Sequence, residues 1–174
     1  GVDFYSVLLE DLKKRLNNED TVINDQKHRL LWLHLKPYYP QSIFSTLRKK
    51  GAVVAFEEYS QLYWNPLDSD NPYLSLANKM IDHFGWGPLD IIADNILAII
   101  SEYNIDGVIG FSHWGCRQSN GRMDLLHEIL KEHDIAFLNI DGDLVDTRNY
   151  REEQLITRLE AFIELMDVKK GSKL

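Results

Sequence analysis

The segment from residue 107 to residue 143 decides the fold, and it reads GVIGFSHWGCRQSNGRMDLLHEILKEHDIAFLNIDGD. Its first apolar run, Gly107 to Phe111, has the length of a buried strand, and a second run follows at Ile135 to Ile140. Between them, residues Ser119 to His133 carry apolar side chains at helical spacing. Two strands that are apolar on both faces and joined by a helix are typical of a parallel sheet covered by helices.

The rest of the chain continues this alternation. Further strands are expected at His28–Leu35 and Ala52–Phe56, and further helices at Asp3–Asn17, Ser42–Lys50, Tyr73–Phe84, Pro88–Tyr103 and Glu152–Met166. The pattern predicts an α/β fold with an open, doubly wound, mainly four-stranded parallel sheet, a three-layer sandwich of the Rossmann-like or flavodoxin-like kind. We expect the first and third strands to be neighbours in its middle. Gly51 suits a left-handed position after a helix, and Leu155, Leu159 and Phe162 should bury the last helix.

Length and composition fit one globular domain. Of the 174 residues, 44% are hydrophobic and 26% are charged, and the net charge of −8 argues against a nucleic-acid partner. The longest apolar run, Ile96 to Ile100, is far too short to cross a membrane. We expect an N-terminal helix and linker over residues 1–26, an α/β body over 27–168 and a tail over 169–174. A soluble, cytoplasmic protein is the expectation.

Cys116 is the most informative candidate for chemistry, and it is the only cysteine of the chain. It lies between a buried strand and a helix, so the N–H groups of the helix start and the positive charge of Arg117 would stabilise its thiolate. The alternative is a small apolar side chain that fills space. A lone cysteine allows neither an internal disulfide nor a self-contained thiolate metal cage.

His113 and Cys116 together are candidates for a Cys–His nucleophile pair, with Asp141 or Asp143 as the group that orients the histidine. A chain with such a pair would be a hydrolase. More often, a histidine at this place caps a helix or bonds to a backbone carbonyl, and this second interpretation is favoured.

Other polar residues follow the strand ends, where ligands bind in open α/β sheets. Asp141 and Asp143, with Asp146 nearby, are candidates for a hard-cation site, although a tight turn with Gly142 at positive φ is favoured. Glu57 and Glu58 either face the cleft or are solvated charges. Three aromatic residues could line a pocket or pin a loop: Tyr59, Tyr63 and Trp64.

Several segments together resemble one family, that of the 2-hydroxyacyl-CoA dehydratases and benzoyl-CoA reductases. The most specific are SHWGCRQ at residues 112–118 and LNIDGD at 138–143, at their mutual spacing. The likeness also takes in Gly121, Gln154, residues 157–162, residues 28–32 and residues 51–54, and so covers nearly the whole chain.

This resemblance implies a double α/β-domain subunit that holds a 4Fe–4S cluster with three cysteines, one of them in its C-terminal domain. Cys116 matches that ligand, with Ser112, His113, Trp114, Gly115, Arg117 and Gln118 as the cluster environment. The other two cysteines belong to the preceding part of such a subunit. The chain is therefore expected to be the C-terminal part of a longer subunit and to hold no cluster alone, because one thiolate cannot bind four irons.

The implied activity is radical chemistry on an acyl-CoA thioester, with dehydration by a lyase favoured over ring reduction. An ATP-dependent activator would pass one electron to the cluster, and the cluster would pass it to the thioester carbonyl. The implied partners are the upstream domain, a second homologous subunit, the activator and the acyl-CoA, and His113 is a candidate for lining the cavity. The alternative is a scaffold or subunit-interface module without a cluster. The final Ser172-Lys173-Leu174 matches a peroxisomal signal, which the family resemblance outweighs.

Overall fold

The protein contains one all-parallel sheet with the strand order β2-β1-β3-β4. Its strands are β1 (His28–Leu33), β2 (Ala52–Glu57), β3 (Gly107–His113) and β4 (Ala136–Gly142). The computed structural model describes residues 1–20, 23, 25–39, 42–61, 66–83 and 87–172, so Tyr63, Trp64, Phe84, Lys173 and Leu174 lie outside the described residues. The predicted open α/β sandwich is confirmed, including the central pairing of the first and third strands.

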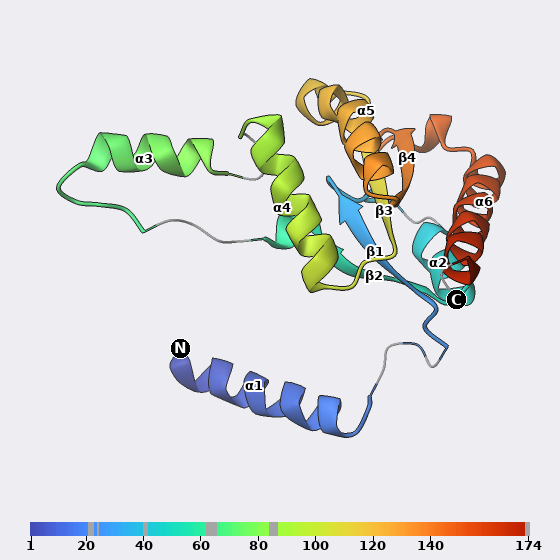
Figure 1. Cartoon of the computed structure of the whole chain (residues 1–174), viewed down its shortest axis with the longest axis horizontal. Helices are drawn as coiled ribbons and strands as arrows, with labels where there is room; N and C mark the ends of the chain where they lie inside the picture. The colour runs from blue at the N-terminus through green and yellow to red at the C-terminus, as the bar shows by residue number, and fades with distance from the viewer. Residues whose placement is uncertain (21–22, 24, 40–41, 62–65, 84–86, 173–174) are drawn as a thin grey trace.

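Helices cover both faces of the sheet (Figure 1). On one face, α2 (Ile43–Lys49) and α6 (Glu152–Gly171) pack over a core that includes Leu30 and Trp32. On the other face, α4 (Leu89–Glu102) and α5 (Arg117–Glu132) pack over a core that includes Leu31 and Leu33. Because successive side chains of a strand point to opposite faces, the unbroken apolar run of β1 supplies both cores.

Two helices stand away from this body in Figure 1. They are α1 (Val2–Asn17) and α3 (Pro72–Ile81), and neither contains a buried residue. The predicted N-terminal helix is confirmed, and its apolar side chains, among them Phe4 and Leu12, are exposed. None of the described helices combines the length and the apolar character that crossing a membrane requires.

The ends of the elements differ from the prediction at the edge where the strands finish. β1 stops at Leu33, whereas β3 continues to His113 and β4 to Gly142. The longer strands are held by backbone pairing of Ser112 with Asp141 and of His113 with Gly142. The prediction of a tight turn with positive φ at Gly142 was wrong, because Gly142 is the last residue of β4. Positive φ at Gly51 is confirmed, at 79°.

Candidate functional site

The carboxyl ends of the parallel strands meet at one edge of the sheet, and Cys116 lies there in a tight turn between β3 and α5. The Cys116 N–H donates to the His113 carbonyl at 2.9 Å, and the Asn120 side chain donates to the same carbonyl at 2.9 Å. The Trp114 N–H donates to the Gly142 carbonyl of β4 at 3.1 Å. These bonds fix the turn, and Cys116 is the N-cap residue of the 16-residue helix α5.

The thiol of Cys116 is half-buried and free. It adjoins the N–H groups that begin α5, and these have no partner within the helix. Arg117 and Gln118, the residues after it, are exposed, as are Trp114 and Gly115 before it. The predicted place of Cys116 at a helix start is confirmed.

His113 lies against the same turn, and a Cβ on Gly115 would be 3.0 Å from its Nε2 atom. Its Nδ1 atom is buried, with no hydrogen-bond partner in the part of the chain that the structure describes. No hydrogen bond joins the His113 ring to the Cys116 thiol among these residues. The geometry therefore lacks the contact that a Cys–His nucleophile pair requires.

A buried ion pair joins the segment that follows β2 to α5, the helix that begins after Cys116. Glu58 begins the 3₁₀ helix η1 (Glu58–Ser60) after β2, and its side chain is 3% exposed. It lies 2.7 Å from the Arg122 guanidinium of α5, which is 9% exposed. The interpretation of Glu58 as a solvated charge was wrong. Glu57 does not take part in this buried pair. It forms an ion pair with Lys36 at 2.7 Å, in which both side chains are partly exposed.

His34 completes this cluster, and the sequence analysis did not identify it. It follows β1 with φ of 69°, an uncommon conformation for a residue with a side chain. The backbone N–H of His34 donates a hydrogen bond to a Glu58 carboxylate oxygen at 2.8 Å. Burial, and then the charge of Arg122, lower the pKa of His34, so that its ring is neutral at neutral pH.

Tyr59 covers this cluster on the outside. The centroids of the Tyr59 and His34 rings are 5.8 Å apart, and Tyr59 as a whole residue is 40% exposed. Burial, and then the neighbouring Glu58 carboxylate, raise the pKa of Tyr59, while the charge of Arg122 opposes this shift. Glu58 and Tyr59 follow the end of β2, and Cys116 follows the end of β3.

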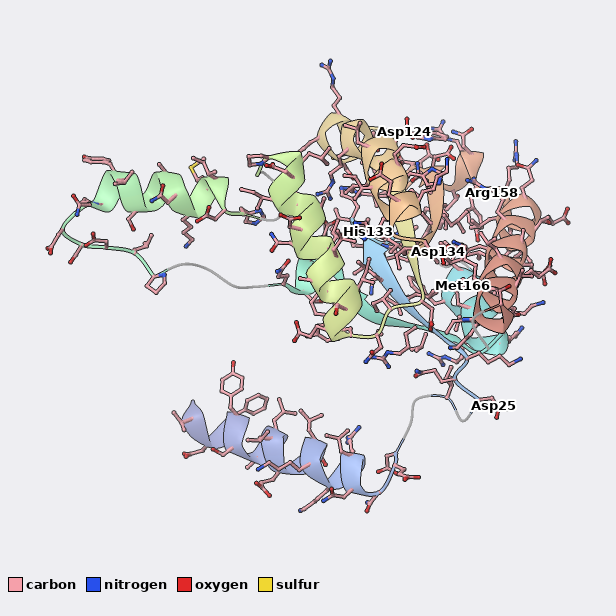
Figure 2. The ribbon with its side chains drawn as sticks, in the orientation of Figure 1. Asp25, Asp124, His133, Asp134, Arg158 and Met166 are labelled. Atoms are coloured by element: carbon pink, nitrogen blue, oxygen red, sulfur yellow. The ribbon has the colours of Figure 1, made fainter. Side chains whose placement is uncertain are left out.

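Asp141, near the end of β4, and Asp143, which follows β4, line a cavity on the α6 side of the edge. This cavity measures about 140 Å³ and is lined in part by Asp141, Asp143, Trp114, Tyr150 and Arg158. Arg158 of α6, labelled in Figure 2, forms a 3.5 Å ion pair with Asp141. Within the described residues, no three His, Cys, Asp or Glu side chains are grouped to hold a metal ion, so a hard-cation site here has no structural support.

Asp143 and Asp146 instead cap a turn. Asp143 accepts hydrogen bonds from the N–H groups of Val145 and Asp146, at 2.8 and 2.7 Å. Asp146 accepts from the backbone and side chain of Arg148, and these bonds lower the pKa of its carboxyl to about 2.

Replacing Arg148 with alanine is expected to raise the pKa of Asp146 toward its ordinary value of 3.8, because the guanidinium bond is the largest cause of the shift. A carboxyl group whose pKa is lower in the folded protein than in the unfolded chain stabilises the fold at any pH above the unfolded pKa. This stabilisation is lost as the pH falls toward 2, the pKa of Asp146 in the folded protein. Carboxyl carbon NMR titration of both proteins measures the change. A titration curve for Asp146 that is the same in both would contradict the prediction.

Comparison with known proteins identifies the family. The chain matches the sequence model of 2-hydroxyglutaryl-CoA dehydratase, D-component, over residues 1–166. The chain belongs to this family. The resemblance inferred from the residues around Cys116 is thereby confirmed.

Relatives of this chain include subunits named as acyl-CoA dehydratases and a subunit named as a benzoyl-CoA reductase. The chain is 23% identical to the (R)-phenyllactyl-CoA dehydratase alpha subunit of Clostridium sporogenes, over 99% of its own length and 42% of the relative. It is 23% identical to a benzoyl-CoA reductase subunit of Thauera aromatica, over 98% and 43%. It is 22% identical to the alpha subunit of (R)-2-hydroxyglutaryl-CoA dehydratase from Acidaminococcus fermentans, over 98% and 36%. The chain spans about two fifths of the length of these relatives.

Proposed function

We propose that this chain is part of a subunit of a radical-type (R)-2-hydroxyacyl-CoA dehydratase or benzoyl-CoA reductase-like enzyme, and that Cys116 supplies one ligand to its 4Fe–4S cluster. The observation that carries the proposal is the placement of Cys116. It is the only cysteine, half-buried, at the N-cap of α5 and at the sheet edge where open α/β proteins bind ligands.

The described residues alone do not fit a whole cluster. A four-iron cluster requires several protein ligands, and the chain offers one thiolate, with no group of three His, Cys, Asp or Glu among the described residues. The remaining ligands would come from the rest of a longer polypeptide, whose upstream domain is the first proposed partner. A second homologous subunit, an ATP-dependent electron donor and an acyl-CoA substrate complete the proposed set.

Around a bound cluster, the residues of this chain would have defined tasks. The N–H groups at the start of α5 would direct positive dipole toward the Cys116 sulfur, which favours its metal-bound form and tunes a reduction potential. The His113 ring would shield one side of the turn, since it already lies against Gly115. When bound, such a cluster supplies single electrons for reductive chemistry.

Cys116→Ser tests the proposal in the assembled enzyme that contains this chain. We expect the variant to lose the cluster signal in electron paramagnetic resonance and to lose turnover, while circular dichroism stays unchanged because serine is nearly isosteric. Leu125→Ala, at a 54% exposed position of the same helix α5, serves as the control and should keep its iron. A Cys116→Ser enzyme with full iron content and normal turnover would remove Cys116 from the ligand set.

A further inference from the structure

The cavity at the carboxyl edge of the sheet, about 140 Å³ in volume, lies where α2 and α6 pack on the ends of β3 and β4. Its lining includes four buried apolar side chains from these four elements: Ile43, Phe111, Ile140 and Leu155. An apolar cavity of about 150 Å³ in another protein binds benzene. The cavity at the sheet edge therefore has the size and the apolar lining for one six-membered ring.

Aromatic side chains add to this lining. Tyr39 and Tyr150 contact each other edge to face, with 5.3 Å between the ring centroids and 65° between the ring planes. Trp114 also lines the cavity and is 49% exposed, so its ring belongs to the outer part of the lining. Aromatic rings attract one another in edge-to-face and offset arrangements. These three side chains therefore favour an aromatic occupant over an aliphatic one.

Gly142, the last residue of β4, keeps part of this space open. A Cβ atom placed on Gly142 would lie 3.5 Å from the Cζ atom of Phe111, which is ordinary van der Waals contact. Because Gly142 lies in a strand, its backbone conformation is open to other residues. Since Gly142 and Phe111 both line the cavity, a larger side chain at position 142 would occupy the space beside the Phe111 ring.

The cavity adjoins the turn that carries Cys116. Trp114 lies two residues before Cys116, and its N–H donates to the Gly142 carbonyl at 3.1 Å. His113, which precedes Trp114, pairs with Gly142 in the sheet. A group bound in the cavity would therefore lie against the segment that holds the proposed cluster ligand.

The charge of the lining does not favour an anionic occupant. The charged residues of the lining are three aspartates and two arginines: Asp141, Asp143, Asp146, Arg151 and Arg158. Asp141 is already paired with Arg158 at 3.5 Å. The cavity thus has no surplus of positive charge for a ligand carboxylate, and a carboxylate placed against the apolar side chains would lose part of its hydration.

We propose that this cavity binds the aromatic ring of the acyl group of the thioester substrate, and that Gly142 is a residue that determines this specificity. This inference rests on the proposed function. It names the substrate class as acyl-CoA thioesters whose acyl group ends in an uncharged aromatic ring, as opposed to short aliphatic or dicarboxylic acyl groups. Burial of the ring against Phe111, Tyr39 and Tyr150 supplies affinity, because it removes apolar area from water.

Equilibrium binding of three unreactive thioesters to the assembled enzyme that contains this chain tests the inference. The probes are 3-phenylpropanoyl-CoA, propanoyl-CoA and glutaryl-CoA, none of which has a hydroxyl group to lose or a ring conjugated with the carbonyl. Isothermal titration calorimetry measures the three dissociation constants. We expect 3-phenylpropanoyl-CoA to bind about 10-fold more tightly than either of the others, or better, since burial of one ring contributes at least that factor.

Gly142→Val places a side chain in the space that the ring would occupy. This variant is expected to bind 3-phenylpropanoyl-CoA and propanoyl-CoA with nearly equal affinity. The matched control is Gly121→Val, at an exposed position of α5 where a Cβ atom would meet nothing within 4 Å, and it should keep the preference of the wild type. Gly142→Ala adds only the Cβ atom, in ordinary contact with Phe111, so it serves if the valine variant does not fold. It should reduce the preference in the same direction.

The outcomes separate this inference from the proposed function. If none of the three thioesters binds to the wild type, the proposed function fails, and the inference fails with it. If they bind but the ring gives no gain in affinity, or if glutaryl-CoA binds most tightly, the assignment of the cavity alone is overturned. If the gain is present and the Gly142 variants retain it in full, the ring binds elsewhere, and the assignment is likewise overturned.

Discussion

Replacing Arg122 with methionine is expected to lower the free energy of unfolding by about 3–5 kcal/mol, because it leaves the Glu58 carboxylate buried without its counter-charge. Glu58 and Arg122 are 3% and 9% exposed, so water does not screen the loss. Methionine matches the apolar stem of arginine and keeps most of the packing on α5. Urea denaturation of the wild type and the variant measures the difference in unfolding free energy, provided that the two proteins unfold with the same m-value.

A surface control and a double variant test whether the loss comes from the unpaired buried charge. Lys50→Met removes one partner of a surface pair, Lys50–Glu160, whose side chains are 46% and 41% exposed, and should cost less than about 1 kcal/mol. Adding Glu58→Gln to Arg122→Met removes the unpaired charge but keeps an acceptor for the His34 N–H, so part of the stability should return. A loss below about 1 kcal/mol for Arg122→Met alone would mean that water reaches Glu58 in solution.

The layers of the fold were predictable because they depend on local periodicity. An apolar run such as Val108 and Ile109 specifies a buried strand without knowledge of its neighbours. The strand ends were less predictable, since Ser112 and His113 extend β3 by pairing with β4. Backbone hydrogen bonds of this kind do not depend on apolar side chains, so the hydrophobic pattern of the sequence does not predict them.

The site was predictable only in part. The position of Cys116 followed from the strand before it and the helix after it. The burial of Glu58 did not, because it depends on contacts with His34 and Arg122, which lie 24 and 64 residues away along the chain. One signal was available for Arg122: it is adjacent to Met123 on the buried face of α5. A charged residue on an otherwise apolar helix face indicates a buried partner.

Close packing of α6 on β3 leads to the second large stability effect. Phe162 is 4% exposed, and Met166, labelled on α6 in Figure 2, is 2% exposed. A Cβ placed on Gly107 of β3 would lie 2.8 Å from the Phe162 ring and 2.5 Å from the Met166 sulfur. The absence of a side chain at Gly107 therefore allows the helix to approach the strand, and the Phe162 ring fills the space between them.

Phe162→Ala is expected to cost about 3–5 kcal/mol of unfolding free energy, the range for a fully buried phenylalanine. Leu165→Ala on the same helix, at a 46% exposed position, is the control and should change stability by about 0.5 kcal/mol at most. Because Phe162 and Gly107 share one space, Gly107→Ala should destabilise the wild type more than it destabilises Phe162→Ala. Equal costs in the two backgrounds, or a loss of a few tenths of a kcal/mol for Phe162→Ala, would show that the ring does not pack against β3 in solution.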